Sequence, residues 1–135
     1  MSITLNKIKV GIVGGSGYTG GELIRLITNH PKSKLIFVHS SVNSGIYISD
    51  IHQDLIGETD IKFQNKLNYD IDVLFLCLGH GKSNEFLNNN NIKQEIKVID
   101  LSQDYRLENS FYNKNFDEKK NFVYGLPALK KEKIK

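Results

Sequence analysis

Short apolar runs separated by polar segments divide the first 40 residues into two strands and a helix. β-Branched and other apolar residues predict a strand at 8–13, and KLIFVHS predicts a second strand at 34–40. Between them Leu23, Ile24 and Ile27 recur at helical spacing, and Pro31 ends the helix because it disfavours an α conformation at His30. Strand, glycine-rich turn, helix and strand together span about the 30 residues of a parallel crossover unit.

The same alternation continues along the chain. We expect a weak strand at 61–64 (IKFQ), a strong strand at 72–78 (DVLFLCL), a polar helix from residue 82 (KSNEFLNN) and a strand at 96–100 (IKVID). Residues 45–60 predict only a short helix and a loop. Alternating strands and helices predict an α/β fold of the Rossmann type, with a doubly wound, mostly parallel sheet and helices on both faces.

The composition is typical of one soluble domain. The chain has 135 residues, of which 39% are hydrophobic and 24% charged, and no apolar run approaches the roughly 18 residues of a membrane helix. The first residues lack the features of a secretory signal, so we expect a cytoplasmic location. The net charge of +3 and the short basic segment KKEKIK at 130–135 are too small for a nucleic-acid footprint. We therefore expect neither a nucleic acid nor a membrane as a partner.

The segment GGSGYTGGE at 14–22 follows the first strand and opens the first helix. Unpaired N–H groups at the start of a helix, together with its dipole, attract a phosphate, and glycine lets the backbone approach the ligand. Since the strand ends at Val13, the glycines at 14, 17 and 20 are predicted to serve the turn, the ligand approach and the helix contact. The aromatic residue of the loop is predicted to contact the cofactor or, equally, to pack over the loop or helix. The candidate cofactor contacts here are Gly14, Gly15, Ser16, Gly17, Tyr18, Thr19 and Gly20.

The end of the second predicted strand indicates which dinucleotide is bound. A carboxylate at this point would hydrogen-bond the ribose of NAD and would repel a 2′-phosphate. The sequence VHSSVNSG instead presents the hydroxyls of Ser40, Ser41 and Ser44, with no acidic residue nearby. We therefore predict NADP(H) as the cofactor.

Two residues with reactive side chains are predicted to have no chemical role. Cys77 is the only cysteine, which excludes a disulfide within the chain and a cysteine-based metal cluster, and its apolar run predicts an inert, buried thiol. His52 lies between Asp50 and Asp54, but no further ligand accompanies them. We expect these three side chains to be solvated, and we expect no metal site.

Five ordered motifs resemble one family, N-acetyl-γ-glutamyl-phosphate reductase, and together they span nearly the whole chain. The aspartate motif at 99–107 and the Tyr-Gly-Leu-Pro motif near the end are the most specific. The matching segments are GGSGYTGGE at 14–22, ISDIHQDLIG at 48–57, LGHGKS at 78–83, IDLSQDYRL at 99–107 and VYGLPAL at 123–129.

The resemblance implies an NADP-dependent enzyme of arginine biosynthesis. In that family a cysteine thiolate attacks the acyl phosphate of N-acetyl-glutamyl 5-phosphate, phosphate leaves, and hydride from NADPH reduces the thioester to N-acetyl-glutamate 5-semialdehyde. The nucleophile lies in a Pro-Gly-Cys segment shortly after the Tyr-Gly-Leu-Pro motif. We therefore expect residues 1–135 to be the NAD(P)-binding domain, with about 102–135 leading into a catalytic domain absent from this chain. The chain alone should be inactive, and the full-length enzyme should be a homo-oligomer.

The resemblance also implies roles for residues beyond the glycine loop. His80 and Gly81 are candidates for contact with the nicotinamide half of the cofactor, and Ser102, Asp104 and Arg106 for the substrate side. Asp104 and Arg106 are equally consistent with an ion pair that holds their loop. The segment from Tyr124 to Leu129 is expected to form an apolar junction with the catalytic domain. A related lysine-pathway reductase, aspartate-semialdehyde dehydrogenase and a free-standing nucleotide-binding module stay open as alternatives.

Overall fold

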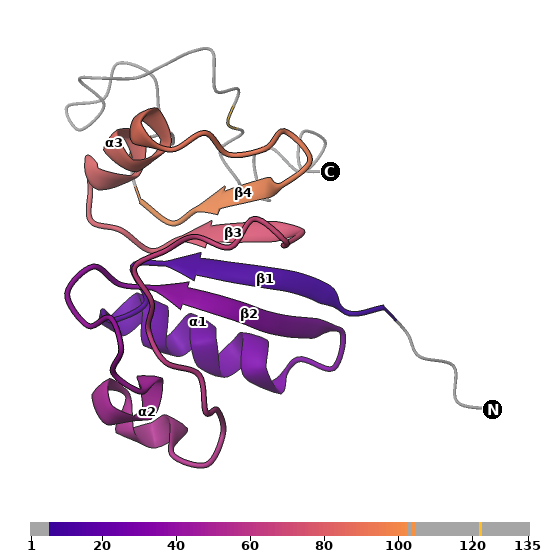
Figure 1. Cartoon of the computed structure of the whole chain (residues 1–135), viewed down its shortest axis with the longest axis vertical. Helices are drawn as coiled ribbons and strands as arrows, with labels where there is room; N and C mark the ends of the chain where they lie inside the picture. Colours follow the sequence, from indigo (N-terminus) through magenta and orange to yellow (C-terminus); the bar gives the residue numbers. More distant parts are fainter. Residues whose placement is uncertain (1–5, 103, 105–121, 123–135) are drawn as a thin grey trace, which may run out of the picture. The chain divides into compact units, whose positions relative to one another are not determined.

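A four-stranded sheet organises the part of the chain that the computed structural model describes, residues 6–102, 104 and 122. The strands are β1 (Ile8–Val13), β2 (Ser33–His39), β3 (Val73–Leu76) and β4 (Lys97–Asp100), in the order β2-β1-β3-β4. β1 pairs in parallel with both β2 and β3, and all four arrows in Figure 1 point the same way. The expected α/β fold with a parallel sheet is confirmed.

The helices agree with the sequence pattern. α1 (Tyr18–Asn29) ends where predicted, since His30 is extended ahead of Pro31. The short α2 (Ile48–Ile51) and a single 3-10 turn, η1 (Gln53–Leu55), fill the region expected to hold a short helix and a loop. α3 (Lys82–Asn89) matches the predicted polar helix. Figure 1 shows α1 beside β1 and β2, so this helix covers one face of the sheet.

The chain divides into two units, each described by itself. The first comprises the described residues 6–77 and 92–99 and contains β1, β2, β3, β4 up to Ile99, α1 and α2. The second comprises the described residues 78–91, 100–102, 104 and 122 and contains α3.

The core of the first unit lies where β1, α1 and the segment after β2 meet. β1 is the inner strand between β2 and β3, and its last four residues are buried, as expected for a parallel strand covered on both faces. The predicted apolar stripe of α1 is confirmed, because Ile24 is fully buried and Leu23 and Ile27 pack against the same cluster. The buried cluster consists of Val10, Ile12, Ile24, Val38, Ile48, Leu55 and Phe63.

The prediction of a strand at 61–64 is wrong. This segment forms only two isolated bridges, a parallel one between His39 and Gln64 and an antiparallel one between Tyr47 and Lys62. Its backbone is shared between two partners: Gln64 N–H donates to Val38, whereas Phe63 N–H donates to Ile46. Neither pairing is long enough to form a strand, and the apolar side chain of Phe63 is buried in the core instead.

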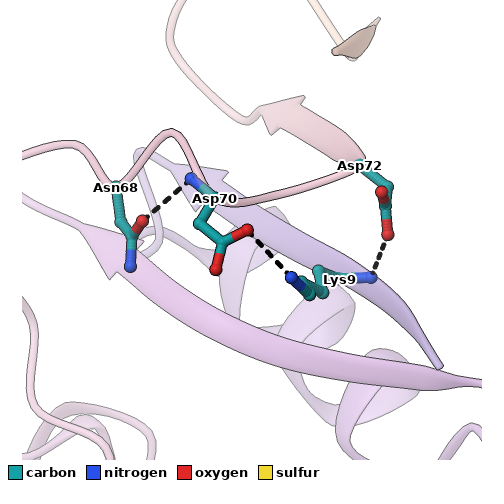
Figure 2. Close-up of polar contacts among 4 residues, drawn as sticks. All are labelled: Lys9, Asn68, Asp70 and Asp72. Atoms are coloured by element: carbon teal, nitrogen blue, oxygen red, sulfur yellow. Dashed lines mark hydrogen bonds and ion pairs between the residues drawn. The ribbon is translucent and has the colours of Figure 1, made fainter. Parts of the chain in front are cut away.

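A polar cluster joins the beginnings of β1 and β3 (Figure 2). The backbone N–H of Lys9 donates to Asp72 Oδ2 at 2.8 Å, and its ammonium group forms an ion pair with Asp70 at 2.8 Å. Asp70 N–H donates in turn to Asn68 Oδ1. The hydrogen bond and charge of Lys9 lower the pKa of the exposed Asp70 carboxyl. Because β1 and β3 start here, this cluster lies at the end of the strands opposite the glycine loop.

Candidate cofactor-binding site

The glycine-rich loop lies at a topological switch point of the sheet. After β1 the chain passes to β2 on one side and later returns to β3 on the other side of β1. At the carboxyl ends of these strands, Cys77 N–H donates to the Val13 carbonyl at 2.8 Å. Parallel sheets bind their ligands in the crevice beyond such a point, and residues 14–17 lead from it into α1.

The loop begins with a turn that only glycine adopts readily. Gly14 has a φ of 83°, in the left-handed region. The N–H groups of Gly14 and Gly15 both donate to the His39 carbonyl, at 3.0 and 3.3 Å, which ties the loop to the end of β2. The predicted role of Gly14 in the turn is confirmed.

Close packing explains two further glycines. A Cβ at Gly20 would lie 2.6 Å from Gly15 Cα, so α1 packs directly on the backbone of the loop, as predicted. A Cβ at Gly15 would overlap the Cγ1 methyl of buried Val38. Val38 thus occupies the space that an alanine methyl at position 15 would need.

The start of α1 presents unused donors. Among the described residues, no backbone carbonyl accepts the N–H groups of Ser16, Gly17, Tyr18 or Thr19, and Gly17, the N-cap, lacks a side-chain capping bond. A Cβ at Gly17 would meet no atom within 4 Å. An anion placed here would find N–H donors, the positive end of the helix dipole and open space.

Tyr18 does not pack over the loop or the helix, because it is 87% exposed. That alternative is wrong, and contact with a cofactor stays a prediction.

The serines after β2 differ in their surroundings. Ser40 is buried and its Oγ accepts the N–H of Asn43 at 3.2 Å, so it closes the turn that follows β2. Ser41 and Ser44 are exposed. The hydroxyls of Ser41 and Ser44 can therefore reach a ligand, whereas the Ser40 hydroxyl is engaged in a hydrogen bond within its own loop.

Burial perturbs the histidine that ends β2. It lowers the pKa of His39, although a hydrogen bond with the backbone of Asn65 raises it in part. The neutral imidazole is therefore favoured at this end of the strand.

His52 is not solvated as expected. It is half-buried, and its Nε2 lies 2.7 Å from the Gly15 carbonyl oxygen in the glycine loop. Sequence reasoning missed this contact because His52 is 37 residues away in the chain. The only available signal was the histidine within the segment 48–57 that resembles the reductase family.

Cys77 is half-buried rather than fully buried. It follows β3 directly and packs against the core cluster of the first unit. Its contact with the core agrees with a structural role for the thiol.

In the second unit, Asp104 caps α3. Its Oδ1 accepts the N–H of Gly81 at 2.5 Å and its Oδ2 accepts the N–H of Asn84 at 2.9 Å. Gly81, the N-cap of α3, has a φ of 82°, so the carboxylate also fixes the turn after His80. Asp104 is only 3% exposed. A negative charge at this position is favourable because it faces the positive end of the helix dipole.

Ser102 supports the same arrangement. Its hydroxyl donates to Asp100 Oδ2 at 2.7 Å and accepts the N–H of Asp104 at 3.2 Å. Ser83 of α3 donates to Asp100 Oδ1 at 2.6 Å. This network supports a structural role for Ser102 and Asp104. Arg106 and the segment 123–129 lie outside the described residues, so the expected ion pair and apolar junction stay predictions.

The described residues contain no group of three or more His, Cys, Asp or Glu side chains that could hold a metal ion. Within the same part of the chain, no helix combines the length and apolar character needed to cross a membrane.

One family model matches residues 9–135 of this chain, nearly its whole length, and is described as "Semialdehyde dehydrogenase, NAD binding domain". Three similar proteins bear the name N-acetyl-gamma-glutamyl-phosphate reductase. They come from Bacteroides thetaiotaomicron (47% identical over 90% of this chain), Christiangramia forsetii (47% over 95%) and Azobacteroides pseudotrichonymphae (50% over 95%). The chain spans 36–38% of the length of these relatives.

A solved structure has a similar fold. It is described as aspartate semialdehyde dehydrogenase with NADP from Candida albicans, and it matches with a TM-score of 0.64 at 23% identity. The match covers 76% of this chain and 32% of the other.

Proposed function

Because this chain belongs to the family described as the NAD-binding domain of semialdehyde dehydrogenases, we propose that its glycine loop holds the pyrophosphate of NADP(H). We further propose that the domain works in an acyl-phosphate reductase that converts N-acetyl-glutamyl 5-phosphate to N-acetyl-glutamate 5-semialdehyde. The observation that carries the proposal is the set of unused N–H groups beside Gly17, in a chain 47–50% identical to proteins named as that reductase.

The residues of the loop fit a pyrophosphate. The N–H groups from Ser16 to Thr19 can donate to phosphate oxygens, and the open space at Gly17 lets the ligand approach the backbone. The Ser16 and Thr19 hydroxyls add donors next to these groups. When bound, the cofactor would supply the hydride that reduces the substrate. The loop itself would bind and orient the cofactor and would take no part in the covalent chemistry.

The proposed preference for NADP(H) rests on the loop after β2. Residues 39–49 contain no carboxylate that would repel a 2′-phosphate, and exposed Ser41 and Ser44 can donate hydrogen bonds to it. The solved relative described with NADP agrees with this choice.

The reactive thiol is proposed to come from a part of the longer enzyme outside these 135 residues. Cys77, the single cysteine, packs on the core at the end of β3. This packing favours a structural role for the thiol. The chain should therefore bind nucleotide and catalyse nothing by itself.

The second unit is proposed to serve the nicotinamide and substrate ends of the reaction. His80 and Gly81 form the turn before α3, which Asp104 holds through the N–H of Gly81. Asp104 is therefore a positioning residue in this proposal, with Ser102 supporting it. Arg106 is retained as a candidate for contact with the small-molecule acyl phosphate.

Titration separates the parts of the proposal. The chain should bind NADPH at least tenfold more tightly than NADH and show no reductase activity. Binding with no preference, or a preference for NADH, would contradict the cofactor assignment. The longer protein should reduce N-acetyl-glutamyl 5-phosphate in preference to the acyl phosphates of aspartate or of the lysine pathway. Sedimentation would test the expected homo-oligomer, and cell fractionation the cytoplasmic location.

A further inference from the structure

His52 lies between the glycine loop and α1, although it is 37 residues from Gly15 in the sequence. Its Nε2 is 2.7 Å from the Gly15 carbonyl oxygen, and a Cβ built on Gly21 of α1 would lie 2.6 Å from its ring. The Phe63 ring packs against it at 6.2 Å between centroids, with an interplanar angle of 59°. The imidazole thus touches the loop, the helix and the core within the first unit.

We propose that His52 is a positioning residue for the phosphate-binding loop: by donating to the Gly15 carbonyl it aims the N–H of Ser16 at the phosphate. This inference rests on the proposed function of the loop. It adds a residue from the α2 segment that no glycine motif contains.

The geometry of one peptide unit carries the argument. A carbonyl oxygen only accepts, so Nε2 must carry the proton in this contact. The Gly15 carbonyl and the Ser16 N–H belong to the same planar trans peptide and point in opposite directions. A hydrogen bond that fixes the carbonyl therefore fixes the N–H, which points away from His52. Glycines at 14, 15 and 17 would otherwise leave this peptide free to rotate.

Gly21 belongs to the same arrangement. Alanine is favoured over glycine inside a helix, yet a methyl group at position 21 would collide with the imidazole. Glycine at position 21 therefore leaves room for the imidazole, although it lowers the helix propensity of α1. Gly21 and His52 act as a pair, one making room and the other donating the hydrogen bond.

The experiment compares four variants of the 135-residue chain. His52→Phe fills the space without a donor, and His52→Gln keeps a donor. Gly21→Ala displaces the imidazole without a substitution at His52 or at residues 14–17. His30→Phe changes an exposed histidine at the far end of α1 and is the matched control. NADPH affinity is measured by fluorescence titration, and the Ser16 amide and Gly15 carbonyl resonances are recorded by NMR without nucleotide.

His52→Phe should weaken NADPH binding about three- to tenfold, the effect of one hydrogen bond, and Gly21→Ala should act in the same direction. His52→Gln should recover part of the affinity, and His30→Phe should change nothing. The Ser16 and Gly15 resonances should move in His52→Phe before any nucleotide is added.

The outcomes distinguish the two proposals. If the wild-type chain binds no NADPH, the proposed function fails, whatever the resonances show. If it binds NADPH and His52→Phe, or Gly21→Ala where His52→Phe does not fold, retains the affinity and the loop resonances of the wild type, the role of His52 is overturned. Equal losses in His52→Phe and His52→Gln would also overturn it, because they would indicate a packing effect alone.

Discussion

Replacing Gly15 with alanine tests the packing of the glycine loop on the sheet. The added methyl would overlap Val38 Cγ1 and lie 3.4 Å from Phe63 and 3.6 Å from Ile24. Carbon atoms prefer separations of about 3.5–4.0 Å, so Val38 or the loop must shift by more than about 1 Å. Val38 is fully buried in β2 and is β-branched, which restricts its rotation. Relief by a rotamer change is therefore disfavoured.

The expected cost follows from these contacts. Overpacking a close-packed core costs about 1–3 kcal/mol, and replacing glycine in the unfolded chain returns about 0.4–1 kcal/mol. Gly15→Ala should thus lower the free energy of unfolding by about 1–2 kcal/mol. Val38→Ala alone should cost about 2 kcal/mol, from two lost methyl groups and the cavity they leave. Because the double variant removes the overlap, it should be no less stable than Val38→Ala, whereas additive effects would predict a loss of about 3–4 kcal/mol.

Urea denaturation followed by circular dichroism measures these differences in a chain without tryptophan. A loss of 1.5 kcal/mol should move the midpoint by about 1 M, for a slope of about 1.5 kcal/mol per molar urea. Gly17→Ala is the control, because its methyl would meet no atom within 4 Å. Additive losses in the double variant, or a Gly15→Ala midpoint equal to that of the wild type, would refute the packing argument.

Three further predictions use the same assays. Gly20→Ala should destabilise the chain more than Gly21→Ala despite equal gains in helix propensity, since its methyl meets loop backbone instead of a movable side chain; the reverse order of urea midpoints would contradict this. Asp104→Ala should cost about 1–3 kcal/mol by removing the carboxylate that accepts the N–H groups of Gly81 and Asn84, and hydrogen exchange at these two amides should quicken; unchanged exchange would count against the capping role. Burial lowers the pKa of His39 below its ordinary 6.5, so the unfolded state binds more protons as the pH falls through about 6.5. The free energy of unfolding should therefore decrease as the pH falls through this range, and the decrease should be smaller in His39→Gln. Equal pH profiles of stability for the wild type and the variant would contradict this role of His39.

The sequence predicted those features that depend on local pattern. The limits of β1 and α1 follow from an apolar run and from Pro31, and the roles of Gly14 and Gly20 follow from the strand boundary at Val13. These features are local because each depends on residues within one turn or one strand. The NADP(H) preference and the ligand contact of Gly17 stay predictions.

Features that depend on contacts between distant segments were not predictable from one sequence. His52 reaches Gly15 across 37 residues, and Asp104 caps a helix that begins 22 residues earlier. Neither residue has a periodicity that signals its partner. The prediction of a strand at 61–64 was wrong for a similar reason. The backbone of this segment forms hydrogen bonds partly with β2 and partly with the loop that follows β2.

The glycine loop is proposed to bind the phosphates of NADP(H) through backbone N–H groups that donate to no backbone carbonyl within the described residues. Calorimetric titration of NADPH into the 135-residue chain and into Gly17→Ala tests this binding. We expect saturable one-to-one binding by the wild type and at least a tenfold weaker affinity for Gly17→Ala, with unchanged circular dichroism. A folded wild-type chain that does not bind NADPH, or a Gly17→Ala variant that binds it equally well, would show that the loop does not hold the phosphates in this way.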